Sequence, residues 1–188
     1  MSNMKKIFVL FIILLILIPS ATAENVNIKG IDFEIPHQYE HGTKKDTSYV
    51  YESGFKFRIL NLDDSKNLRF NFGSDVSESK SVEQTTIAGH DAVVVSGEYN
   101  SKPHTTVYFV TGNQIFLICF NDTYVNNDIT GIIEKTPSQT MSHDEFSNSL
   151  NKALDDYQKQ VEQENRDYDS YQSSKNNKAS TRYYFFSF

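Results

Sequence analysis

Residues 105–120 of the chain read TTVYFVTGNQIFLICF, and this stretch decides the fold. Gly112 and Asn113 stand between two apolar runs, where a Gly-Asn pair supplies the positive φ angles that a two-residue hairpin turn requires. The sequence therefore predicts two paired strands, over residues 105–111 and 114–121. The second run is continuously apolar, whereas a strand with one wet face would alternate. We therefore expect both faces of this hairpin to be covered.

On both sides of this hairpin, short apolar runs alternate with turn residues, which is typical of a largely antiparallel sheet. The further predicted strands are residues 25–28, 31–35, 47–52, 55–60, 68–72, 85–87 and 92–99. Turns are expected at Ser53-Gly54 and at residues 100–103, and the polar residues 61–67 are expected to form a hairpin loop. The sequence contains 14 Phe and 11 Tyr but no Trp. This aromatic load favours strands over a helical bundle.

Two helices are predicted after the last strand, and they would cover the sheet. Residues 126–135 place their isoleucines on one face, and Thr136-Pro137 ends this helix. The second helix opens with a capping box formed by Ser142 and Glu145. Its apolar stripe has helical spacing and consists of Phe146, Leu150, Leu154, Tyr157 and Val161.

The stripe of the second helix continues through Tyr168 and Tyr171, so this helix is expected to run to about Tyr171 with its last turns in water. Residues 172–180 are polar and are expected to be flexible. The chain then ends on an aromatic tail, for which docking on the domain and binding of a partner are both open. The residues of this candidate interaction tail are Tyr183, Tyr184, Phe185, Phe186 and Phe188.

The start of the chain has the order of residues found in a secretory signal peptide. Lys5 and Lys6 precede an apolar run over residues 7–18, and Ala21 and Ala23 form an A-x-A site. We expect cleavage between Ala23 and Glu24. The alternative is a retained membrane anchor, but the run is shorter than the roughly 20 residues that span a bilayer. No stable membrane span is therefore expected after cleavage. A secreted or extracytoplasmic cell-surface protein is therefore predicted.

The expected organisation is a signal peptide over residues 1–23, a single α/β domain over residues 24–162, and a polar helix extension with a flexible, aromatic-ended tail over residues 163–188. The chain carries 24 acidic and 18 basic residues, a formal net charge of −6. Nucleic acids and anionic membranes demand basic patches, so no nucleic-acid partner is expected. A possible partner is an envelope protein or a wall component.

Residues 30–36 read GIDFEIP, which resembles the G-x-x-F-x-I-P opening of Mog1/PsbP-like domains. Residues 86–92 (TIAGHDA) and 108–118 (YFVTGNQIFLI) resemble the G-x-x-A turn and the two central strands of that superfamily. The resemblance covers roughly residues 25–161. It implies an α+β fold in which helices cover an antiparallel sheet as an α/β/α sandwich. It also implies a binding or accessory role, and no shared catalytic residues are carried over.

Several further residues are candidates for a chemical or binding role. Cys119 is expected to be a buried, unreactive thiol, and Asn121 opens an N-x-T sequon that is a candidate glycosylation site. The oxygen-bearing residues of the 61–67 loop lack the Gly and Glu of a calcium-binding hand. The five histidines are His37, His41, His90, His104 and His143. His37 and His41 are four residues apart, which on a helix would suit a metal, but Pro36 and Gly42 argue for a loop, so surface-loop histidines are expected.

No catalytic motif is present, and no catalytic, cofactor or metal residues are predicted. The expected function is that of an exported, non-catalytic binding or accessory module of the cell envelope. Two alternatives stay open. One is a small-ligand carrier, in which Tyr49, Tyr51, Phe55 and Phe57 line a pocket against a helix. The other is a hydrolase with a dispersed site, in which a Ser or Asp converges with His90 or His104.

Overall fold

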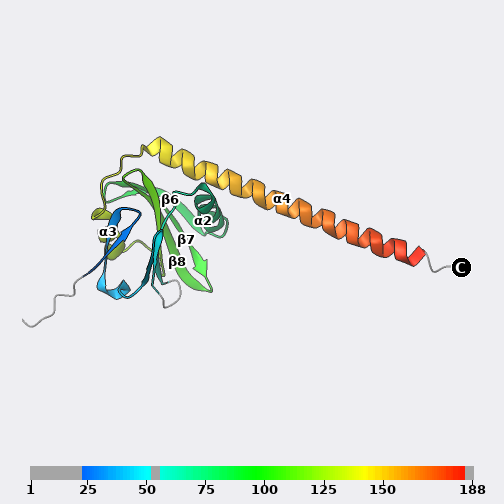
Figure 1. Ribbon diagram of the computed structural model, residues 1–188, viewed down its shortest axis with the longest axis horizontal. Helices are drawn as coiled ribbons and strands as arrows, with labels where there is room; N and C mark the ends of the chain where they lie inside the picture. Colours follow the sequence, from blue (N-terminus) through cyan, green and yellow to red (C-terminus); the bar gives the residue numbers. More distant parts are fainter. Residues whose placement is uncertain (1–22, 52–55, 185–188) are drawn as a thin grey trace, which may run out of the picture.

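The computed structural model describes residues 23–51 and 56–184, and it shows a sheet domain from which one long helix projects (Figure 1). The elements run in the order β1 Glu24–Ile28, β2 Ile31–Ile35, the short 3₁₀ helix η1 His37–Tyr39, β3 Thr43–Lys45, β4 Ser48–Val50, β5 Phe57–Asn61, α2 Ser65–Ser77, β6 Ser81–Ile87, β7 His90–Tyr99, β8 Lys102–Thr111, β9 Gln114–Phe120, α3 Asn127–Glu134 and α4 His143–Tyr184.

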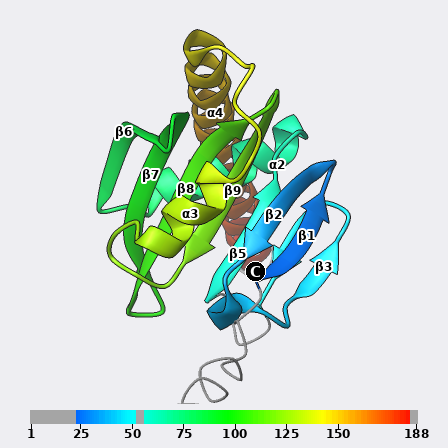
Figure 2. The same ribbon diagram turned by 90° about the vertical axis from the view of Figure 1, so that its left-hand side faces the viewer.

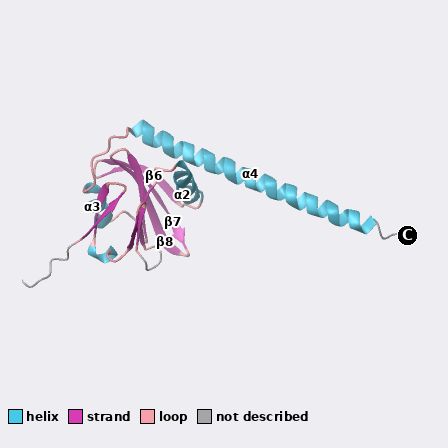
Figure 3. Ribbon diagram, viewed as in Figure 1, coloured by secondary structure: helices cyan, strands magenta, loops and turns pink. Residues whose placement is uncertain are grey.

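The described strands form two antiparallel sheets, so the fold is α+β (Figure 3). The larger sheet has seven strands in the order β3-β4-β5-β9-β8-β7-β6, and β1 pairs with β2 in a separate hairpin. The long hairpin of β8 and β9 lies at the centre of the large sheet. It closes at Thr111 and Gln114, which are partners in the register, and Gly112 has a φ of 55°. The hairpin predicted from the Gly-Asn pair is confirmed.

The two faces of β8 and β9 belong to two different cores. Phe109, Phe116 and Ile118 pack with the β1-β2 hairpin and α3, whereas Tyr108 and Leu117 pack with α2 and the first turns of α4. Figure 2 shows these layers, with α3, β1 and β2 in front of the sheet and α2 and α4 behind it. The expectation that the central strands are covered on both faces is therefore confirmed.

The predicted strand at residues 68–72 is wrong, because this segment lies inside helix α2. Leu68, Phe70 and Phe72 alternate with polar residues, which is the period of a strand, yet Phe70 is 65% exposed. The helical spacing of Leu68 and Phe72, four residues apart, is the one that buries side chains against the sheet. Asp64 starts the helix by accepting a hydrogen bond from the backbone N–H of Lys66. The expected hairpin loop over residues 61–67 is therefore a strand-to-helix junction.

The two predicted C-terminal helices are present. Asn126 caps α3 by accepting a hydrogen bond from the backbone N–H of Ile129, and Ser142 Oγ accepts one from the backbone N–H of Glu145 at the start of α4. Residues 172–180, expected to be flexible, are helical, and α4 continues through Tyr183 and Tyr184. Residues 1–22, the Ser53-Gly54 turn, Phe55, and the tail residues Phe185, Phe186 and Phe188 lie outside the described residues.

Candidate functional site

The first turns of α4 anchor this helix to the sheet domain. Phe146, Leu150 and Ala153 are buried in the core shared with α2. Farther along, Tyr157 lies against Gly73 of α2 so closely that no β-carbon would fit there. The domain therefore holds about the first four turns of α4.

The rest of α4 leaves the domain. Every side chain from Gln158 to Tyr171 is exposed, and Figure 1 shows this part of the helix extending past α2. Val161, Tyr168 and Tyr171 are 37%, 63% and 62% exposed. We call these three residues the outer stripe. Their spacing places them on the same helix face as the anchored Tyr157.

The remaining side chains of the projecting helix are polar and are linked by pairs one turn apart. Arg166 forms an ion pair with Glu162 at 3.6 Å, and Gln160 Nε2 donates to Glu164 at 2.8 Å. Such pairs each stabilise an exposed helix by about 0.2–0.5 kcal/mol. The outer stripe is thus a line of apolar side chains, interrupted by Glu164, on an otherwise polar helix.

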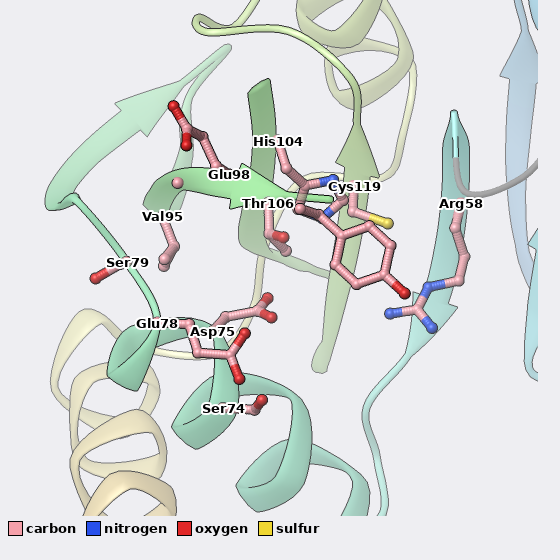
Figure 4. A pocket seen from close by; sticks show the side chains of 12 residues that line it. Arg58, Ser74, Asp75, Glu78, Ser79, Val95, Glu98, His104, Thr106 and Cys119 are labelled. Atoms are coloured by element: carbon pink, nitrogen blue, oxygen red, sulfur yellow. The ribbon is translucent and has the colours of Figure 1, made fainter. Parts of the chain in front are cut away.

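A cavity opens beyond the end of α2, on the same sheet face that this helix covers (Figure 4). We call it the Arg58 pocket. Its volume is about 190 Å³. Among the residues that line it are Arg58, Asp75, Glu78, Gly97, His104 and Cys119.

Strand register brings the sheet side of the Arg58 pocket together. Arg58 of β5 lies opposite Cys119 of β9, and Cys119 lies opposite Thr106 of β8. Gly97 of β7 lies opposite His104 of β8. Residues from three distant parts of the sequence therefore form one wall, while α2 supplies Asp75 and Glu78 for the other (Figure 4).

The polar groups of the Arg58 pocket are only partly satisfied. Arg58 Nη2 donates to Asn71 at 3.2 Å, but its Nε is buried without a hydrogen-bond partner, as is Nδ1 of His104. Tyr108 Oη donates to Asp75 at 2.6 Å. A buried donor without a partner costs roughly 1–3 kcal/mol. The pocket therefore holds two groups that a ligand would satisfy.

Cys119 lies at the base of this pocket and is 2% exposed. Burial raises the pKa of its thiol, an effect that the nearby Arg58 guanidinium opposes only in part. The sulfur therefore stays protonated at neutral pH, and a protonated thiol is a weak nucleophile. The expectation of a buried, unreactive Cys119 agrees with this environment.

The described aromatic residues that were predicted to line a carrier pocket pack in or against the hydrophobic core. Tyr49 and Phe57 are fully buried and pack edge to face at 6.3 Å, and Tyr49 Oη accepts from the backbone N–H of Gly42 at 2.8 Å. These two residues belong to the core, and Phe55 lies outside the described residues. Tyr51 packs against the same core.

The histidines are dispersed over the fold. His37 Nδ1 lies 2.6 Å from Glu40 Oε2, and His143 contacts Asp91 at 3.2 Å. His90 is not in a surface loop as expected, because it is buried with Nδ1 2.6 Å from the carbonyl of Val110. Within residues 23–51 and 56–184, no three His, Cys, Asp or Glu side chains gather as a metal-binding group.

The oxygen-bearing residues of the 61–67 segment hold the junction between β5 and α2. Asn61 is 3% exposed, and its Nδ2 donates to Asp63 and, at 2.8 Å, to Gln114. Their side chains bond one another rather than converging on an ion. Asn121 is exposed directly after β9, a position that a glycosyl-transferring enzyme can reach. Glu24, the residue after the expected cleavage site, opens β1.

No protein-family model matches the chain, and no curated protein matches it. The chain is similar to a crystal structure from Bacteroides thetaiotaomicron VPI-5482, with a TM-score of 0.40 and 11% sequence identity. The similarity covers 66% of this chain and 50% of that chain, so this chain spans half the length of that protein.

Among residues 23–51 and 56–184, no helix is both long enough and apolar enough to cross a bilayer. The long helix α4 fails on composition, because its projecting part is polar outside the outer stripe.

Proposed function

We propose that this protein is an exported, non-catalytic binding module of the cell envelope, and that α4 is the element that binds its partner. The observation that carries the proposal is the outer stripe. The helix face that anchors α4 to the domain continues past the edge of the domain as Val161 and Tyr168. A helix face of this kind gains most of its stability from packing against another surface.

The export part of the proposal rests on the signal-like order of residues 1–23. We further propose that the fold is an α/β/α sandwich of Mog1/PsbP-like type. Helices on both faces of the antiparallel sheet support this assignment, as does the GIDFEIP segment that forms the β1-β2 turn and β2. The same assignment favours an accessory role over catalysis.

A non-catalytic role also fits the groups in the Arg58 pocket. Nδ1 of His104 has no hydrogen-bond partner, so neither a serine nor an aspartate is bonded to that nitrogen. Asp75 is engaged by Tyr108, and the thiol of Cys119 is protonated. Nucleophilic catalysis needs a nucleophile within hydrogen-bond reach of its base.

The occupant of the outer stripe that we propose is a helix of an envelope protein. Alternating steps of three and four residues along Val161, Glu164, Tyr168 and Tyr171 match the seam of a two-helix coiled coil. Glu164 lies inside this seam. A second copy of the chain would bury a second Glu164 in the same seam, which is unfavourable. A partner helix with a Lys or Arg opposite Glu164 would instead neutralise the charge.

The test compares two double variants of the full chain in its native cells. Val161→Gln with Tyr168→Gln removes the apolar part of the stripe while keeping good helix formers. Lys159→Gln with Arg166→Gln, on the opposite face, is the matched control. We expect the wild type and the control to be recovered with the envelope fraction and the stripe variant to be released from it. Retention of the stripe variant would contradict the proposal.

A further inference from the structure

We infer that the Arg58 pocket is a binding site for a small zwitterion of the free amino acid class, whose carboxylate lies at Arg58 and His104 and whose ammonium group faces Asp75 and Glu78. This site is separate from the outer stripe of α4 and goes beyond the proposed partner binding.

The pocket exists because α2 is shorter than the strands it covers. Phe72 packs edge to face on Tyr108 at 5.0 Å and closes the sheet surface there, whereas the helix ends at Ser77. The turn that follows packs on the sheet at Gly97, where a β-carbon would lie in ordinary van der Waals contact, 3.4 Å from the backbone oxygen of Glu78. The strands continue beyond this turn, and the space between the strands and the turn is the Arg58 pocket.

The anionic end of the ligand is specified by Arg58. Its Nε is buried without a partner, its Nη2 donates to the neutral amide of Asn71, and the guanidinium lies beside the neutral thiol of Cys119. Within the described parts of the chain, Arg58 forms no ion pair with a carboxylate. A guanidinium held in this way binds a carboxylate through two parallel N–H groups. Nδ1 of His104, also buried without a partner, adds a second contact for the same group.

The cationic end is specified by the wall that α2 supplies. Asp75 uses one carboxylate oxygen for the hydroxyl of Tyr108, which leaves the other oxygen for a ligand. Glu78 caps the helix and lies at the mouth of the pocket. In Figure 4 both carboxylates lie on the α2 side of the pocket, across from Arg58. Glu98, also in the lining, is already paired with Lys80 at 2.5 Å.

The charged groups and the volume of the Arg58 pocket together indicate the chemical class of its ligand. A dicarboxylate would meet Asp75 and Glu78 with like charge, and a diamine would meet Arg58 with like charge. A volume of about 190 Å³ is well below the roughly 300–1,000 Å³ of pockets for drug-sized ligands. A free amino acid has both charges at the required ends and a size that fits.

The experiment measures binding of the twenty free amino acids to the full chain by calorimetry and by the shift in melting temperature. We expect at least one to bind with a Kd below about 1 mM, and its N-acetyl and carboxamide derivatives, which each lack one charge, to bind at least ~10-fold more weakly. Arg58→Met should weaken binding about 10–100-fold, and Glu78→Gln about 3–10-fold. Lys152→Gln on α4 should leave affinity unchanged.

Because Arg58→Met could alter packing, near-ultraviolet circular dichroism checks that the variant is folded, and the exposed Glu78→Gln variant provides an independent test. The inference is overturned if no amino acid binds the folded wild type at about 10 mM. It is also overturned if either derivative binds as tightly as the free amino acid, or if folded Arg58→Met keeps the wild-type affinity.

Discussion

Gly73 of α2 and Tyr157 of α4 pack so closely that a β-carbon built on Gly73 would lie 2.2 Å from Cγ of Tyr157. Beyond this contact, every side chain from Gln158 to Tyr171 is exposed. The missing side chain at position 73 therefore sets where α4 lies on α2.

Substitution of Gly73 by Ala should destabilise the protein by about 1–3 kcal/mol, because overpacking outweighs the gain in helix propensity. Urea unfolding measures this difference. In a Tyr157→Ala background the same substitution should instead stabilise by up to about 1 kcal/mol. Equal effects of Gly73→Ala in the two backgrounds would show that the contact does not constrain α4.

Tyr108→Phe removes a buried hydroxyl that donates to Asp75 at 2.6 Å. A hydrogen bond to a charged group contributes about 1.5–3 kcal/mol, and we expect the lower end because water can reach Asp75. The matched control is Tyr124→Phe, whose ring is 64% exposed and whose substitution should be neutral. A neutral Tyr108→Phe would contradict the bond.

The same variant should change the response to alkali. Burial, together with the charge of Asp75, raises the pKa of Tyr108 well above its ordinary value. The unfolded chain ionises this tyrosine near pH 10 while the folded chain does not. The contribution of Tyr108 is thus fully present below about pH 10 and is lost as the pH rises further. Urea midpoints from pH 8 to pH 11 should therefore fall less steeply for Tyr108→Phe than for the wild type.

Asp91 holds the segment that leads into α4. Gln139 Nε2 donates to Asp91 Oδ2 at 2.9 Å, and this bond, followed by the contact with His143, lowers the pKa of Asp91. A lowered pKa gives stability that is present above about pH 4 and is lost as the pH falls through the folded-state value. Asp91→Asn should cost roughly 0.5–1 kcal/mol at pH 6, and this cost should shrink steadily as the pH falls below about 4.

The matched control for this substitution is Asp169→Asn, on the exposed part of α4. It should leave the urea midpoint unchanged at both pH values. An Asp91→Asn effect as large at pH 3 as at pH 6 would rule out the proton-linked contribution.

Ala88 has a φ of 51° in the turn between β6 and β7. This left-handed conformation is unfavourable for residues with a β-carbon, by roughly 1 kcal/mol, and asparagine tolerates it better. Ala88→Asn should therefore raise stability by about 0.5 kcal/mol, whereas the β-branched Ala88→Val should lower it by about 1–2 kcal/mol. Thermal melts of both variants measure these changes, and destabilisation by Asn would contradict the turn geometry.

The sequence predicted those parts of the fold that local patterns determine. The β8-β9 hairpin follows from continuous apolar runs around Gly112, and the start of α4 follows from the Ser142 capping box. The segment of α2 was misassigned because Leu68, Phe70 and Phe72 satisfy a strand period locally. Only the tertiary position of the sheet decides that Phe70 faces solvent and Leu68 does not.

The Arg58 pocket could not be predicted in the same way. Arg58, His104 and Cys119 are far apart in the sequence, and only the strand register places them on one wall. No local motif records that register, because it depends on how β5 pairs with β9. The outer stripe was predicted as a continuation of the apolar spacing, but its projection from the domain follows from how far α4 extends beyond its contact with Gly73 of α2.

The most direct measurement of the central claim is photocrosslinking from the projecting part of α4 in intact cells. A benzophenone amino acid is placed at Tyr168 in the outer stripe or at Arg166 on the opposite face. We predict that the Tyr168 position, and not the Arg166 position, forms an adduct with an envelope protein, at a helical peptide that carries a Lys or Arg. Adducts only with a second copy or with wall material, equal adducts from both positions, or none at Tyr168 would contradict the account.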